Sequence, residues 1–183
     1  MKTQLMSVVT LSLATLLSTS GALAQEPTPK GCFVFSDKSE SVVVGYQDKF
    51  FSWSNRPLYK ECPKDVVIPD SVTKIGEWAF NGKKLTSVVI GNSVTWIGWR
   101  AFALNQLTSV VIGNSVTKID EAAFAKNNLT SVVIPDSVTE IGERAFLFNC
   151  LDSKSVSLPK ALQSQDTLDS ILGNQAEDQR NCQ

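Results

Sequence analysis

A unit of 22 residues is repeated four times without a gap between residues 66 and 153. The copies begin at Val66, Val88, Val110 and Val132. They read VVIPDSVTKIGEWAFNGKKLTS, VVIGNSVTWIGWRAFALNQLTS, VVIGNSVTKIDEAAFAKNNLTS and VVIPDSVTEIGERAFLFNCLDS. A fixed period of this length predicts a solenoid, in which each repeat forms one coil and buries its apolar face against the next coil.

The apolar spacing inside the unit predicts a strand at the start of each coil. A Leu-x-x-Val-x-Ile pattern crosses each junction, as at Leu85, Val88 and Ile90, and is typical of leucine-rich repeats. Because side chains alternate along a strand, we expect Val88 and Ile90 to point into the core and Val89 to point outward.

The second half of each unit returns to the core at a different spacing. Ile97, Ala101 and Phe102 are spaced as on a helix, so we expect a short helical turn there. The predicted fold class is therefore an α/β repeat, a leucine-rich-repeat solenoid with one parallel β-sheet and short helical turns on the other side.

The repeat phrase narrows this prediction to a family. SVT-x-IG-x-x-AF, as in residues 71–80 and 137–146, followed by LTSVVIP-like strands, resembles the BspA-type (Treponema-type) leucine-rich repeats of bacterial secreted and surface proteins. Residues 32–69 also resemble the amino-terminal cap of secreted repeat proteins of this type. The resemblance implies adhesion or host-protein binding and no chemistry. Such adhesins often carry more repeats, so four repeats imply a small binding surface.

Residues 1–24 have the pattern of a secretory signal peptide. Lys2 gives a positive start, an apolar stretch covers residues 5–17, and Ala22, Leu23 and Ala24 form a small-x-small cleavage site. The apolar stretch is too short and too rich in Ser and Thr to span a bilayer. We expect cleavage after Ala24, no membrane span in the mature chain, and a secreted, periplasmic or cell-surface location.

The segment before the repeats predicts a linker and a cap. Residues 25–31 are interpreted as a short extended linker and residues 32–65 as an N-terminal cap. The apolar runs at residues 33–35 and 41–44 predict a hairpin that covers the first coil. A solenoid needs such a cap because its end coil otherwise exposes core side chains and an unpaired strand edge.

The segment after the repeats, residues 154–183, predicts a C-terminal cap. Residues 156–159 keep the apolar spacing of a fifth, degenerate strand. Residues 164–172 predict a closing helix that ends at Gly173 and covers Leu147 and Phe148.

Four cysteines remain in the mature chain, which predicts disulfides in an oxidising compartment. Four cysteines allow three pairings. Cys32 and Cys62 both precede the repeats, and Cys150 and Cys182 both lie at or beyond their end. Because bridged Cα atoms lie within about 7 Å of each other, the favoured pairs are Cys32–Cys62 and Cys150–Cys182.

Charge and composition bear on the partners. Of the 17 Lys and Arg residues only Lys2 lies in the signal segment, so the mature chain has 16 basic against 18 acidic residues. A chain without a basic excess is not expected to bind nucleic acid.

Catalytic residues are hard to find in this sequence. There is no His, which removes the usual general base and the commonest zinc ligand. Carboxylate pairs exist, such as Asp120 and Glu121 or Glu140 and Glu143, but they occupy variable positions that fit a solvated face better than a cleft. We therefore expect no enzyme activity, no cofactor and no metal site.

Two repeating rows admit a structural and a functional interpretation. Asn105, Asn127 and Asn149 recur one coil apart, and such a ladder is most simply structural, because its amides satisfy buried backbone groups. The outward positions of the strands form a second row, flanked by threonines, and we call this set the valine ladder. It consists of Val67, Val89, Val111 and Val133 with Thr86, Thr108 and Thr130. A uniform row suits a periodic lattice such as ice, although strand propensity explains the same residues.

Tryptophan replaces the usual residue at three positions of the repeat. Trp96 stands where other copies have Lys or Glu, Trp99 where they have Glu, and Trp78 where they have Arg or Ala. With Arg100 one coil from Trp78, these side chains could form one exposed aromatic patch with cation–π support. The alternative is that the rings only cover the outside of the core.

These observations lead to two hypotheses. The first is an exported, non-enzymatic binding or adhesion protein that recognises a protein or glycan through Trp78, Trp96, Trp99 and Arg100. The second is a structural or lattice-binding module that uses the valine ladder.

Overall fold

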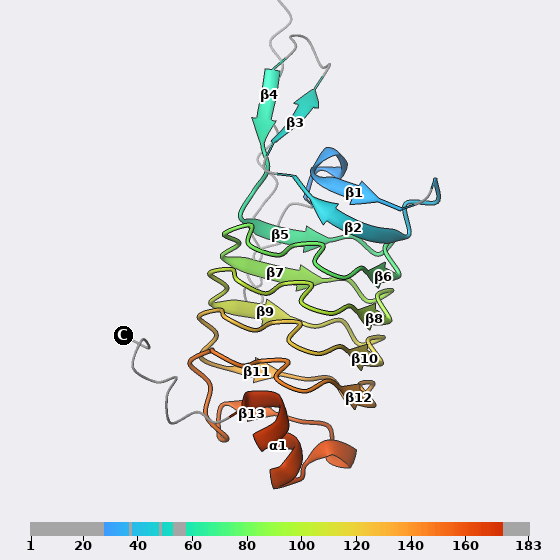
Figure 1. Ribbon diagram of the computed structural model, residues 1–183. Coiled ribbons are helices and arrows are strands. Elements are labelled where there is room, and N and C mark those ends of the chain that lie inside the picture. The colour runs from blue at the N-terminus through green and yellow to red at the C-terminus, as the bar shows by residue number, and fades with distance from the viewer. Residues whose placement is uncertain (1–27, 37, 48, 53–57, 174–183) are drawn as a thin grey trace, which may run out of the picture.

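The computed structural model describes residues 28–36, 38–47, 49–52 and 58–173. The predicted signal peptide, its cleavage site and Cys182 lie outside the described residues. Figure 1 shows the repeats stacked as coils along one axis, with a hairpin at one end and a helix at the other.

One side of the solenoid is the predicted parallel sheet. It contains β5 (Asp65–Ile68), β7 (Ser87–Ile90) and β9 (Ser109–Val111). Equivalent residues of neighbouring repeats face each other, because Val66 pairs with Val88 and Val88 with Val110. The next two coils form a separate parallel pair, β11 (Val132–Val133) with β13 (Val156–Ser157). The leucine-rich-repeat solenoid is thus confirmed, together with its degenerate fifth strand.

The other side differs from the predicted helical turns, because it carries a second parallel sheet. Its strands of two residues are β6 (Lys74–Ile75), β8 (Trp96–Ile97), β10 (Lys118–Ile119) and β12 (Glu140–Ile141). Within the described part of the chain, the single α-helix belongs to the C-terminal cap.

Backbone geometry explains why no helix forms after these short strands. In each coil the third residue after the short strand has a positive φ between +50° and +59°, which interrupts a right-handed helix; these residues are Trp78, Arg100, Ala122 and Arg144. Alternate N–H groups also bond to the next coil, as Trp78 N does to Trp99 O and Phe80 N to Ala101 O, at 3.0 and 2.8 Å. The hydrogen bonds therefore connect coils to one another.

The core is filled as the spacing predicts. Val88 and Ile90 are buried, with 1% and 2% of their surfaces exposed, while Val89 is half-buried. The four phenylalanines of the AF motif stack face to face along the axis, and neighbouring ring centroids lie 4.8, 5.2 and 5.2 Å apart. They are Phe80, Phe102, Phe124 and Phe146, all fully buried.

The N-terminal cap contains the predicted hairpin. Strands β1 (Phe33–Phe35) and β2 (Val42–Tyr46) pair antiparallel, and β2 continues the second sheet by pairing parallel with β6. The rings of Phe33 and Tyr46 pack on Phe80 and so close the end of the phenylalanine stack. A second antiparallel pair, β3 (Lys49–Ser52) with β4 (Leu58–Glu61), lies above this cap (Figure 1).

The linker expected at residues 25–31 is described only from residue 28 onward, and this part is not extended throughout. Residues Lys30–Cys32 form a 3₁₀ turn, and Cys32 is bonded to Cys62 with their Cα atoms 5.7 Å apart, as predicted. The buried hydroxyl of Thr28 accepts a hydrogen bond of 2.7 Å from Val67 N. These contacts fix the chain against the first coil.

The C-terminal cap ends in the predicted closing helix. Helix α1 (Gln165–Leu172) follows the 3₁₀ turn Lys160–Leu162. Ser164 caps its start by accepting a hydrogen bond from Thr167 N, and Gly173 caps its end. Figure 1 shows the helix at the end of the stack. Gly173 packs directly against Leu147, because a Cβ at this glycine would collide with the Leu147 side chain.

The helix also completes the hydrogen bonding of the last coil. Arg144 N donates to Ser170 O at 2.8 Å, and Phe146 N donates to Ile171 O at 3.0 Å. The last carbonyls of a helix have no partner inside it, and the last coil of a solenoid has no following coil. Each set of unpaired groups thus satisfies the other.

Two further observations concern the second predicted disulfide and the length of the helices. Cys150 is disulfide-bonded, while its predicted partner Cys182 lies outside the described residues. None of the helices in the described ranges has the length and apolar character needed to cross a bilayer.

Candidate binding surface

The asparagine ladder has the structural role that the sequence favours. Asn127 Oδ1 accepts from Leu107 N at 3.1 Å, and Asn127 Nδ2 donates to Phe102 O and Phe124 O, each at 3.0 Å. Asn105 and Asn149 make the equivalent bonds. Because all three side chains are buried and bonded, this row is not a ligand site.

Trp78, Trp99 and Arg100 form one cluster in the turns that follow the short strands of the second sheet. We call this side of the solenoid the turn side and the cluster the tryptophan cluster. The two indole rings meet edge to face with centroids 4.9 Å apart. The Arg100 guanidinium carbon lies 5.1 Å from each ring centroid. Trp78 keeps 41% of its surface exposed, so the cluster reaches solvent.

Backbone bonding holds this cluster in register. Trp78 N donates to Trp99 O at 3.0 Å, which places the two residues on neighbouring coils. Trp78 and Arg100 occupy equivalent positions of their repeats, both with positive φ. The cation–π contact therefore joins consecutive coils.

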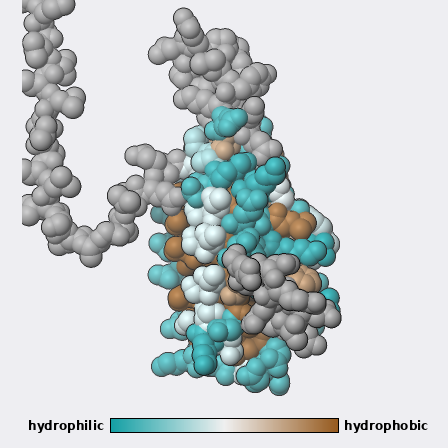
Figure 2. Space-filling view, turned by 90° about the vertical axis from the view of Figure 1, so that its left-hand side faces the viewer, coloured by the Kyte–Doolittle hydropathy of each residue, from teal (hydrophilic) through white to brown (hydrophobic). Residues whose placement is uncertain are grey.

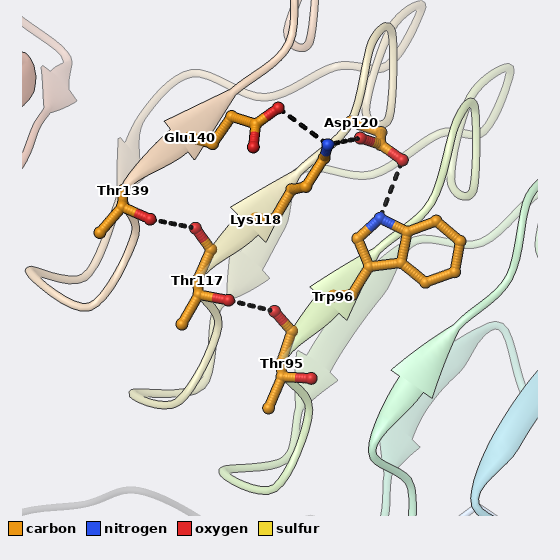
Figure 3. Close-up of polar contacts among 7 residues, drawn as sticks. All are labelled: Thr95, Trp96, Thr117, Lys118, Asp120, Thr139 and Glu140. Atoms are coloured by element: carbon orange, nitrogen blue, oxygen red, sulfur yellow. Dashed lines mark hydrogen bonds and ion pairs between the residues drawn. The ribbon is translucent and has the colours of Figure 1, made fainter.

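Trp96, the third tryptophan of the predicted patch, is directed elsewhere. It lies on the outer face of the second sheet, where its Nε1 donates to Asp120 Oδ2 at 2.8 Å (Figure 3). Lys118 Nζ joins the same group, 3.3 Å from Asp120 Oδ1 and 2.8 Å from Glu140 Oε1. The pKa of Lys118 is raised by its hydrogen bond to Glu140 and, to a smaller extent, by that to Asp120. Trp96 thus belongs to a charged network and not to the tryptophan cluster.

A row of threonines that the sequence analysis did not single out runs beside this network. The hydroxyls of its last three members each donate to the carbonyl of the equivalent residue one coil back, at 3.2, 3.1 and 3.2 Å, and the first donates to Ser41 O in the cap at 3.2 Å. The row contains Thr73, Thr95, Thr117 and Thr139, and Figure 3 shows part of it. The Thr that recurs in every SVT phrase is the signal that would have identified it.

The valine ladder occupies the outer face of the first sheet but is not uniform. Val67 and Val89 are half-buried, whereas Val111 and Val133 are 56% and 69% exposed. The hydrogen-bonded sheet is also interrupted between β9 and β11. Figure 2, viewed toward the side on which β5, β7 and β9 begin, shows a pale, weakly polar column beside an apolar one along the stack.

Side-chain bonds anchor the threonine edge of this ladder in the first coils. The hydroxyls of Ser87 and Thr86 each donate to Asp65 Oδ1 at 2.7 Å. These two bonds hold the pKa of Asp65 below its ordinary value of 3.8. Thr108 Oγ1 in turn donates to Thr86 O at 3.4 Å.

A pocket of about 280 Å³ opens on the turn side, next to the tryptophan cluster. Arg100, Glu121, Lys126 and Arg144 contribute its charged groups. The remaining lining is apolar and consists of Ala103, Leu104, Ala122, Ala125, Leu147 and Phe148. Sequence analysis missed this pocket, although the short Ala122 between Arg100 and Arg144 in the aligned repeats indicates a gap.

Within the described ranges, no group of three or more His, Cys, Asp or Glu residues is arranged to hold an ion. The tryptophan cluster and the adjoining pocket offer aromatic, apolar and cationic groups, which suit non-covalent recognition.

Comparison with known proteins identifies the type of repeat. A family model described as a BspA-type leucine-rich repeat region matches residues 55–168 in six copies. Among curated proteins, no relative matches the chain.

Solved structures give the same architecture. A leucine-rich repeat protein from Bacteroides capillosus is 27% identical, with 72% of this chain and 98% of that protein covered and a TM-score of 0.53. A leucine-rich repeat protein from Eubacterium ventriosum is 28% identical, with 67% and 34% covered and a TM-score of 0.50. The pneumococcal vaccine antigen PcpA is 20% identical, with a TM-score of 0.57; the match covers 71% of this chain but 30% of the antigen, and it shows the fold alone.

Proposed function

Because the chain belongs to the BspA-type leucine-rich-repeat family, we propose that it is an exported, non-enzymatic protein that binds a protein or glycan at the cell envelope or outside it. The observation that carries this proposal is the tryptophan cluster. Trp78, Trp99 and Arg100 meet on one exposed surface where the other repeats place charge or alanine.

The physical character of the cluster supports a binding role. Trp and Arg supply a large share of the energy at protein interfaces, because they bury much surface while keeping polar groups available. Trp78 also adopts φ +59°, which costs a residue with a side chain roughly 1 kcal/mol or more. Because the equivalent Arg100, Ala122 and Arg144 share this conformation, the cost belongs to the repeat, and what distinguishes Trp78 is its exposed indole.

The proposed location rests on two features of the chain. Residues 1–24 have the pattern of a signal peptide, and Cys32 and Cys62 form a disulfide. Disulfides persist in oxidising compartments, so both features support export.

Substitution by sister-repeat residues tests the proposal with little risk to the fold. In a double variant, Trp78→Ala takes the residue of Ala122 and Trp99→Glu that of Glu121. The mature protein is used to capture partners from envelope extracts and on a glycan array. We expect the partner bound by the unchanged protein to be lost by the double variant.

The matched control is Trp96→Lys, which takes the residue of Lys118 and lies outside the cluster. We expect it to retain the partner. Equal loss of binding in the control and in the double variant would refute the cluster as the binding surface.

A lattice-binding role is the second candidate. The in-register pairing of β5, β7 and β9 favours it, because this pairing aligns valines and threonines at strand spacing. The interruption of the sheet after β9 weighs against it. Ice recrystallisation in the presence of the mature protein and of its Val111→Lys variant tests this role, which predicts inhibition by the unchanged protein only.

A further inference from the structure

The pocket beside the tryptophan cluster exists because one short side chain lies between two long ones. Arg100, Ala122 and Arg144 are equivalent residues of consecutive coils and share a positive φ of +50° to +56°. Coils hydrogen-bonded to each other are spaced about 4.8 Å apart. Two arginines therefore flank an opening, one coil wide, above Ala122.

The apolar part of the opening also carries a backbone cost. Leu104 and Phe148 are 50% and 43% exposed, and their φ values are +59° and +58°. The equivalent residue of the first coil is Gly82, with φ +66°, the residue for which this conformation is cheapest. Exposed apolar side chains at these positions gain little from the fold, and we attribute their presence to the surface they form.

The charges at the opening are mostly positive and available. Arg100, Lys126 and Arg144 line it against one carboxylate, Glu121. In the part of the chain that the structure describes, the ion pairs found lie elsewhere and involve none of these four side chains. Lys126 Nζ lies 5.5 Å from the Phe148 ring centroid, so cation and apolar surface are adjacent. Such an opening complements a carboxylate next to an apolar group.

The arrangement favours a peptide over a neutral sugar. Sugars are bound by stacking on indole faces, and Arg100 already occupies one face of Trp78 and one face of Trp99. Contact with the rings leaves the in-plane N–H groups of a guanidinium able to pair with a carboxylate. Acidic side chains beside Leu or Phe occur together in peptide segments, and they match both halves of the opening.

We propose that the opening above Ala122 binds an acidic peptide segment of a protein partner. A carboxylate of the segment lies between Arg100 and Arg144, and a neighbouring apolar side chain packs on Leu104 and Phe148. This inference rests on the proposed function and names the partner class that it left open.

Fluorescence anisotropy on the mature protein tests the inference with three labelled probes. The first is a short peptide in which Asp and Glu alternate with Leu and Phe. The second is the same peptide with Asn and Gln in place of the acids, and the third is an oligogalacturonate of equal charge. We expect the acidic peptide to bind at least about tenfold more tightly than the other two, and raising the salt concentration to weaken it.

Two variants locate the site, and one variant controls for charge. Ala122→Arg introduces the arginine that the neighbouring repeats carry at the same φ, and it fills the opening. It should therefore reduce the affinity for the acidic peptide about tenfold, although it adds a positive charge. Arg144→Ala should weaken it by a similar factor. Lys74→Glu, on the second sheet and away from the opening, should leave binding unchanged. Thermal unfolding followed by circular dichroism checks that each variant folds.

The opposite results would overturn the inference. Tighter binding of the acidic peptide by Ala122→Arg would show attraction to charge alone. Equal binding of the neutral peptide would show that the carboxylate does not contribute. Preference for the oligogalacturonate would indicate an acidic glycan as the partner. The proposed function is judged separately. If a captured partner is lost by the Trp78 and Trp99 double variant but kept by Ala122→Arg, the binding role stands and the acidic-peptide site fails.

Discussion

The side-chain nitrogen of Asn127 lies 3.0 Å from the carbonyl oxygen of Phe102, 25 residues earlier and one coil back. Asn127 Oδ1 meanwhile accepts from Leu107 N at 3.1 Å. One buried amide thus bonds backbone groups of two coils, Leu107 N and Phe102 O in one coil and Phe124 O in the next.

Asn127→Ala should therefore be strongly destabilising. The change leaves the buried Leu107 N without its acceptor, while Phe102 O and Phe124 O keep the bonds from Asn105 and Asn149. We expect it to lower the free energy of unfolding by roughly 1 to 3 kcal/mol. Chemical denaturation measures the change. The neighbouring Asn128→Ala, on an exposed side chain, should cost less than about 0.5 kcal/mol. Equal effects would mean that the buried amide has no special role.

Phe102→Ala should open a cavity in the middle of the stack. Phe102 is fully buried between Phe80 and Phe124, so we expect a loss of about 3 to 5 kcal/mol. The control is Lys118→Ala, which removes ion pairs at the surface and should cost far less than Phe102→Ala. A Phe102→Ala protein that melts no earlier than the control would contradict the inward assignment of the AF motif.

Asp65 should contribute a pH-dependent part of the stability. Bonds from Ser87 and Thr86 lower its pKa in the folded state, so the ionised form favours folding. The contribution is complete above the unfolded value of about 4 and is lost as the pH falls through the lowered folded pKa. We expect about 1 kcal/mol or less, because the carboxylate is largely exposed.

Comparison with Asp65→Asn isolates this effect. The difference in unfolding free energy between the two proteins should shrink as the pH falls from about 6 to about 3. Ser87→Ala should reduce the same difference, because it removes one donor. A difference that is constant across this range would show that Asp65 has no lowered pKa.

The disulfides should close the two caps independently. Peptide mapping without reduction should yield one fragment that links Cys32 to Cys62 and another that links Cys150 to Cys182. Replacing Cys32 and Cys62 with Ser should lower the free energy of unfolding by about 3 to 4 kcal/mol, by freeing the unfolded chain. A fragment that links Cys62 to Cys150 would refute this arrangement.

The sequence by itself determined the period, the inward residues and the ends of the solenoid. Val88, Ile90 and Phe102 could be assigned to the core because a repeat of 22 residues gives every coil the same apolar spacing. The closing helix could be predicted because Leu168, Ile171 and Leu172 share one face at helical spacing and Gly173 is a strong local signal for its end.

Tertiary structure alone decided which rows share a surface. A period shows that Trp78 and Arg100 occupy the same row, but it does not show how Trp96 and Trp99 are directed. Positive φ values after the short strands turn the chain, so Trp99 joins Trp78 while Trp96 remains on the second sheet beside Asp120. The opening above Ala122 likewise depends on the stacking of neighbouring coils, because its walls come from residues one coil apart.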